Sequence, residues 1–126
     1  MTNLKKFPSA KAFMAWLKVK NGNENDVVGI AQESNSCPLA NFFKETTGIQ
    51  NRVDIGTDSF GIQDFYDFQS SKKVTPKYVE YPLPKWAISF VTQIDKNRHE
   101  YYDNQVTAET AMFTLKKVTK KKWEEV

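Results

Sequence analysis

Two kinds of apolar periodicity divide this chain, and their order constrains the fold more than any other feature of the sequence. Apolar residues recur at helical spacing in four segments, which cover roughly residues 9–20, 37–47, 84–96 and 107–118. Residues 52–81 contain runs in which apolar and polar residues alternate as they do in strands. An order of helices, strands and helices is typical of α+β domains, in which helices and sheet are segregated. We therefore expect an α+β fold with two N-terminal helices, a small antiparallel sheet and two C-terminal helices packed on it.

The composition fits a single domain over residues 1–126. Hydrophobic residues make up 40% of the chain and aromatic residues 13%, which is enough to form a core without disulfides or metal. One cysteine and one histidine exclude an intrachain disulfide framework and the usual zinc or iron–sulfur ligand sets, so we expect no metal and no cofactor. No apolar run approaches the roughly 20 residues of a membrane span, and the start of the chain lacks an apolar signal-peptide segment. We therefore expect a cytoplasmic protein with no membrane partner.

Capping residues mark the ends of the expected helices. Ser9 is the expected N-cap of the first helix, and Thr107 is that of the fourth. Ser36 or Cys37 precedes the proline that opens the second helix, and Gly48 ends that helix. Where the apolar stripes of the four helices overlap, we expect these residues to be largely buried: Trp16, Leu17, Phe42, Phe43, Trp86, Phe90, Ile94, Met112 and Leu115.

Three runs within the central region are candidate strands. Residues 52–56 and 77–81 alternate between apolar and polar side chains, and residues 65–69 form a third candidate. Pro76 favours an edge position for the strand that follows it, because proline cannot donate a hydrogen bond to a sheet. Outside this region, the apolar run at residues 27–31 fits either a buried strand or the start of a helix.

Four short segments of the chain resemble a family of small bacterial proteins of uncharacterised function. These segments are Val28-Gly29, Ser36-Cys37-Pro38-Leu39-Ala40, Pro84-Lys85-Trp86-Ala87 and Val106-Thr107-Ala108-Glu109. The resemblance implies a cytoplasmic bacterial protein. It implies no activity, cofactor or site residue.

Cys37 is the most prominent candidate for chemistry. It lies at the start of the expected second helix, where the helix dipole and unpaired N–H groups favour a thiolate. The chain order Cys37, His99 and Asn104 is that of papain-like enzymes, which makes these three residues candidate catalytic residues. The residues around Cys37 do not form the papain signature, and free cysteines are among the most buried residues in proteins. We therefore expect a packed cap residue, and rank a Cys-dependent hydrolase or transferase third among the functions.

The other polar clusters point to structural roles. His99 lies in an expected polar loop at residues 97–106, where a solvated side chain is the simplest interpretation. Four aspartates cluster within residues 54–67, namely Asp54, Asp58, Asp64 and Asp67, but an EF-hand loop that began at Asp54 would fail at three positions. No P-loop, dinucleotide-binding fingerprint or nucleophile elbow occurs in the sequence.

Basic charge is concentrated at the two ends of the chain. Residues 1–20 carry a net charge of +5 and residues 71–126 of +4, whereas residues 21–70 carry −6. The C-terminal region contains the candidate binding residues Lys116, Lys117, Lys120, Lys121, Lys122 and Trp123. Lysines neutralise phosphates and an aromatic ring can stack on an unpaired base, but the chain has only two arginines for base recognition. We expect residues 119–126 to form a basic tail that frays.

Phe113 is a further candidate binding residue, because it falls off the apolar face of the fourth helix. It either contacts a partner or packs beneath the strands, and the sequence favours neither. Our leading hypothesis is a non-enzymatic interaction or regulatory module that binds another protein or a second copy of itself. The alternative is a nucleic-acid-associated accessory protein whose basic ends bind nucleic acid weakly and without sequence specificity.

Overall fold

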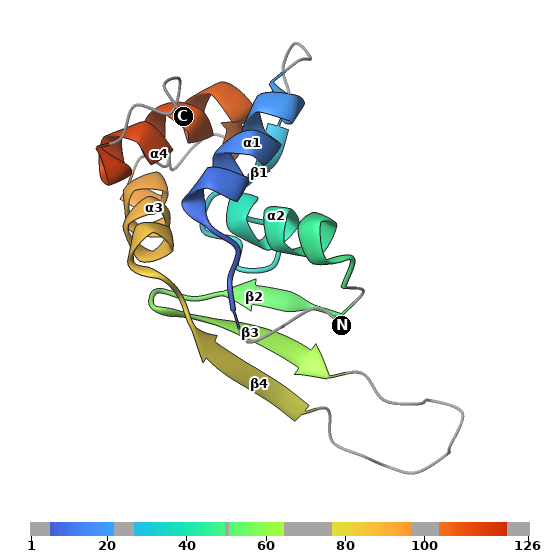
Figure 1. Ribbon diagram of the computed structural model, residues 1–126. Helices are drawn as coiled ribbons and strands as arrows, with labels where there is room; N and C mark the ends of the chain where they lie inside the picture. Colours follow the sequence, from blue (N-terminus) through green and yellow to red (C-terminus); the bar gives the residue numbers. More distant parts are fainter. Residues whose placement is uncertain (1–5, 22–26, 50, 65–76, 97–103, 121–126) are drawn as a thin grey trace.

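The computed structural model describes residues 6–21, 27–49, 51–64, 77–96 and 104–120. This part of the chain forms four helices and five short strands (Figure 1). In chain order they are α1 (Ala10–Lys20), β1 (Val27–Ile30), α2 (Pro38–Thr47), β2 (Val53–Ile55), β3 (Ser59–Asp64), β4 (Lys77–Pro82), α3 (Lys85–Lys96), β5 (Gln105–Thr107) and α4 (Ala108–Thr119).

The strands form two antiparallel sheets among the described residues. β2, β3 and β4 form a three-stranded sheet in that order, and β1 pairs with β5 in a separate two-stranded sheet. The α+β class is confirmed, but the expected arrangement of helices around a single sheet is wrong. β1 separates α1 from α2 and β5 separates α3 from α4, because these two strands pair across most of the length of the chain. The candidate strand at residues 65–69 lies outside the described residues.

The expected caps are confirmed by the geometry of the helix ends. Ser9 Oγ accepts a hydrogen bond from Ala12 N at 3.1 Å, and Thr107 Oγ1 accepts one from Thr110 N at 3.2 Å. These bonds satisfy backbone donors that the first turn of a helix leaves unpaired. Gly48 ends α2 in the left-handed conformation, with a φ of 73°.

Aromatic side chains form much of the core. Phe13 meets Phe90 edge to face at a ring separation of 5.0 Å, and Phe43 contacts Phe60 of β3 at 5.1 Å. Six of the nine residues expected in the core are buried, namely Leu17, Phe42, Phe43, Phe90, Ile94 and Leu115. The other three, Trp16, Trp86 and Met112, are only half-buried and pack against the edge of the core.

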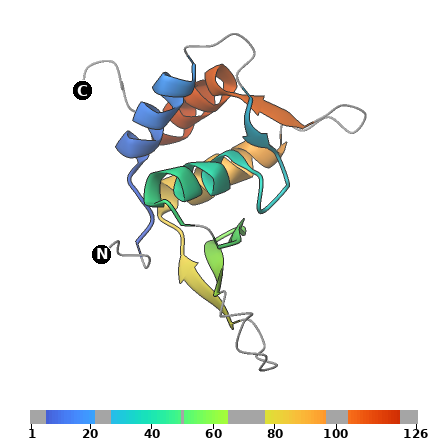
Figure 2. The same cartoon turned by 90° about the vertical axis from the view of Figure 1, so that its right-hand side faces the viewer.

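The helices do not pack on the sheet as expected. Among the helices, α2 makes the main contact with β2, whereas α4 packs between α1 and α3. Figures 1 and 2 show α1 and α4 side by side at one end of the molecule, with the three-stranded sheet at the other end. The sheet accepts α2 because the aromatic face of this helix meets the apolar side of β2 and β3. The apolar faces of the C-terminal helices α3 and α4 pack against each other and against α1.

Candidate functional site

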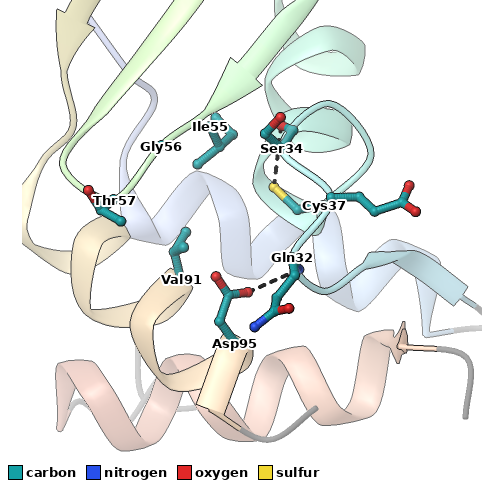
Figure 3. A pocket seen from close by; sticks show the side chains of 9 residues that line it. Gln32, Ser34, Cys37, Ile55, Gly56, Thr57, Val91 and Asp95 are labelled. Atoms are coloured by element: carbon teal, nitrogen blue, oxygen red, sulfur yellow. Dashed lines mark hydrogen bonds between the residues drawn. The ribbon is translucent and has the colours of Figure 1, made fainter. Parts of the chain in front are cut away.

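A cavity of about 120 Å³ lies beside the N-terminus of α2 (Figure 3). Gln32, Ser34 and Cys37 come from the loop between β1 and α2, and Thr57 comes from the turn after β2. Asp95 of α3 lines the cavity beside Gln32. The cavity therefore lies where three segments that are distant in the sequence meet.

Gln32 connects two of these segments. Its φ of 68° is in the left-handed region, which is uncommon for a residue with a side chain. Its backbone N–H donates a hydrogen bond to Asp95 Oδ1 at 3.1 Å. A carboxylate in the last turn of a helix is unfavourable next to the exposed carbonyls, and this N–H offsets that effect. The bond therefore fixes the loop against α3 and holds the wall of the cavity in place.

The environment of Cys37 disfavours a thiolate. The residue is buried at the N-cap of α2, and its sulfur lies 4.0 Å from the carbonyl oxygen of Ser34. Burial raises the pKa of the thiol from 9.0 to about 11, and the negative charge of Asp95 adds to this increase. The N–H groups of Ala40 and Leu39 act in the opposite direction but are outweighed. The burial expected from the sequence is therefore confirmed, and at neutral pH the buried thiol keeps its proton.

The described residues do not assemble the papain-like set around this thiol. Asn104 directly precedes β5, its carbonyl oxygen accepts a hydrogen bond from Ala31 N at 2.7 Å, and it does not line the Cys37 cavity. His99 lies outside the described residues. The cavity thus combines a protonated thiol with a carboxylate that already accepts a hydrogen bond.

A second hollow of about 290 Å³ lies on the face of the three-stranded sheet that carries Asp54 and Glu80. Gly61 contributes no side chain there, which leaves space between the two carboxylates. Arg52 Nε donates to Asp54 Oδ2 at 3.1 Å, and Ser34 Oγ donates to Asp54 Oδ1, also at 3.1 Å. Asp54 is therefore already neutralised and hydrogen-bonded. No group of three metal-ligating side chains occurs within the described ranges.

The outer surface of α4 has a different character. Phe113 is 71% exposed, because Ala111, Thr114 and Leu115 point the opposite side of the helix into the core. Of the two interpretations left open by the sequence, the structure therefore rules out packing beneath the strands. Lys116 and Lys117 follow Phe113 by three and four residues and lie on the same side of the helix, and Lys120 is the C-cap of α4. We call these four residues, Phe113 with the three lysines, the α4 outer face.

The helix next to α4 also carries exposed basic residues. Lys117 and Lys120 are exposed, as are Lys11 and Lys18 on the neighbouring helix α1. Glu109 is the only acidic residue in the sequences of α1 and α4. The other candidate residues of the basic tail, Lys121, Lys122 and Trp123, lie outside the described residues. The described part of this surface therefore combines one exposed aromatic ring with several positive charges.

Comparisons with known proteins do not add a family to this description. No protein-family model, curated protein or solved structure matches the chain. No helix within the described part of the chain is long and apolar enough to cross a membrane.

Proposed function

We propose that this protein is a non-enzymatic interaction module whose α4 outer face binds an acidic segment of another protein. The observation that carries the proposal is the exposure of Phe113, at 71%, among lysines on one side of a helix. Exposed aromatic residues are enriched in the centre of protein interfaces, where they contribute much of the binding energy. The proposal includes the cytoplasmic location expected from the sequence.

The charge of this surface defines the chemistry of the partner. Lys117 and Lys120 place positive charge near the Phe113 ring, and the neighbouring helix α1 carries the exposed Lys11 and Lys18. An acidic partner is attracted by this charge, whereas burial of an apolar partner side chain against Phe113 supplies most of the affinity. The best partner is therefore a segment in which apolar side chains alternate with carboxylates.

A Cys-dependent activity receives less support. A nucleophilic cysteine requires a thiolate near neutral pH, and burial instead raises the pKa of Cys37 to about 11. The Asp95 carboxylate in the same cavity disfavours the thiolate further.

The lysines also favour a second candidate function, weak and nonspecific binding of nucleic acid. Lysines on α1 and α4 could neutralise phosphates, and Phe113 could stack on an unpaired base. Nucleic-acid binding of this kind weakens steeply with salt, because counterions are released on binding. Binding to the protein partner should depend less on salt, since the Phe113 contact is apolar.

An NMR titration locates the binding surface and separates the two candidates. The probes are a synthetic peptide in which leucine alternates with glutamate, a peptide of equal charge in which serine replaces leucine, and a single-stranded oligonucleotide. We expect the leucine-containing peptide to shift the amide signals of α4 around Phe113, and the serine-containing peptide to bind more weakly. Preferential binding of the oligonucleotide would favour the nucleic-acid function. Shifts confined to another surface would contradict both.

Two matched lysine variants test the role of charge. Lys117 belongs to the α4 outer face, whereas Lys85 begins α3 and is also exposed. We expect Lys117→Gln to weaken binding of the leucine-containing peptide and Lys85→Gln to leave it nearly unchanged. Equal effects of the two variants would indicate attraction to the overall charge of the protein and not a specific surface.

A further inference from the structure

The two edges of the three-stranded sheet differ, and this difference points to an interface. The N–H of Ile55 in β2 donates to the carbonyl of Ser34 at 2.8 Å, so the loop before α2 covers the β2 edge. β4 forms the opposite edge, and no strand within the described residues pairs with its outer side. An uncovered edge presents backbone donors and acceptors to any strand of suitable sequence.

The hydrogen-bond pattern identifies the backbone groups on this outer side. Leu83 N donates to Asp58 O at 3.0 Å, which fixes the alternation of the antiparallel β3–β4 ladder. In such a ladder the backbone groups of every second residue bond to the neighbouring strand, so the N–H and C=O groups of Val79 and Tyr81 point towards β3. The N–H and C=O groups of Tyr78 and Glu80 therefore face outward. Pro82 also lies on this side but has no N–H to offer.

The apolar face of the sheet is incomplete at the same edge. Val53, Ile62 and Val79 lie opposite one another in β2, β3 and β4 and form one apolar row across the sheet. Their exposure rises from 0% at Val53 to 6% at Ile62 and 38% at Val79. A further strand beside β4 that carried an apolar residue opposite Val79 would complete the row.

We propose that β4 pairs antiparallel with β4 of a second copy of this chain, with Val79 opposite Val79, to form a symmetric dimer with a continuous six-stranded sheet. In this register the outward N–H of Glu80 donates to Tyr78 C=O of the second copy, and the outward N–H of Tyr78 donates to its Glu80 C=O. The two-fold symmetry repeats both bonds, so the outward groups of both residues are paired.

The charges of β4 favour this register over its neighbour. Hydrogen bonds across this edge join only residues whose backbone N–H and C=O groups point outward. The next such register towards the C-terminus places Glu80 opposite Glu80. That register opposes two carboxylates directly, which is destabilising. In the proposed register Glu80 lies opposite Tyr78, and the two valines complete an apolar row. The proposed β4–β4 pairing involves only a few residues of each chain, so we expect a reversible dimer that depends on protein concentration.

The first test compares three proteins by analytical ultracentrifugation over a range of concentrations. Glu80→Pro removes an outward N–H without removing a bond to β3, and Glu80→Ala keeps the N–H and removes the charge. We expect the wild type and Glu80→Ala to dimerise, and Glu80→Pro to weaken the dimer by at least about tenfold. Circular dichroism verifies that each variant is folded. A wild type that is monomeric throughout, or a dimer unaffected by Glu80→Pro, would overturn the proposal.

The second test fixes the register and does not depend on the proline variant. Val79→Cys places two sulfurs across the two-fold axis, at a separation that a disulfide can span. Val19→Cys is the matched control, because Val19 is 78% exposed but lies on α1. Under a mild oxidant we expect Val79→Cys to cross-link at least about tenfold faster than Val19→Cys. Equal rates would show that β4 does not pair with itself.

Discussion

Gly29 of β1 packs so closely against Pro38 at the start of α2 that no side chain fits between them. A Cβ atom on Gly29 would lie 2.7 Å from Pro38 Cδ and 2.6 Å from the carbonyl carbon of Cys37. The nearest backbone atoms cannot move without displacing the start of α2. Asn41 strengthens the same contact, since its Nδ2 donates to Val28 O at 2.9 Å. β1 and the N-terminus of α2 thus form one rigid wall beside the Cys37 cavity.

Gly29→Ala should therefore destabilise the fold. The methyl group forces β1 away from α2, and overpacking of this kind costs about 1–3 kcal/mol or more. Gly48→Ala is the control, because Gly48 has a φ of 73° but no atom lies within 4 Å of the added Cβ. Only the left-handed backbone is strained there, at about 1 kcal/mol. Urea unfolding measures both variants, and an equal or smaller loss for Gly29→Ala would contradict the close contact.

Two phenylalanines with opposite surroundings give a second stability test. Phe90 is buried against Phe13, whereas Phe113 is exposed. Phe90→Ala should lower the free energy of unfolding by about 3–5 kcal/mol, because it leaves a cavity in the core. Phe113→Ala makes the same truncation on the surface and should change it by about 0.5 kcal/mol or less. Similar losses for the two variants would mean that Phe113 has a structural role.

The pKa of Cys37 predicts a decrease in stability at high pH. The unfolded thiol loses its proton near its ordinary pKa of 9.0, whereas the buried thiol keeps its proton up to about 11. Above pH 9 the unfolded state therefore binds fewer protons, so stability falls as the pH rises towards 11. The loss from this group is at most roughly 2–3 kcal/mol.

Other groups titrate in the same range, so the measurement is the difference between the wild type and Cys37→Ala. We expect the wild type to lose more stability than the variant between neutral pH and pH 11. The thiol should also react with alkylating reagents at neutral pH only when the protein is unfolded. Rapid alkylation of the folded protein, together with parallel stability curves, would show that Cys37 is accessible and ionised.

The sequence predicted the local features of this fold well. Ser9, Thr107 and Gly48 act at helix ends as expected, because capping depends on residues within one turn. Cys37 is buried before Pro38, as its position predicted. The caps follow from short-range hydrogen bonding and backbone conformation, whereas the burial of Cys37 follows from the general tendency of free cysteines to be buried.

The strands were harder to predict because their stability comes from distant partners. β5 falls in a segment expected to be a polar loop, and it becomes a strand by pairing with β1. β3 was missed although Phe60 and Ile62 alternate with Gly61 and Gln63, a pattern that could have indicated it. The hydrogen bond from Gln32 to Asp95 has no comparable signal, since it joins two polar residues 63 positions apart. The sequence did identify Phe113 as a candidate binding residue, but its exposure follows from the packing of α4 and could not be read from the sequence.

The affinities of the leucine-containing acidic peptide for the wild type and for Phe113→Ser measure directly whether the α4 outer face binds such a segment. Calorimetry at low and at moderate salt provides both values, and the urea midpoint verifies that the variant is folded. If the α4 outer face binds an acidic protein segment, Phe113→Ser should lower the affinity by about tenfold or more. The wild type should also retain most of its affinity at moderate salt. Equal affinities for the two proteins, or binding that disappears with salt in both, would contradict the proposed function.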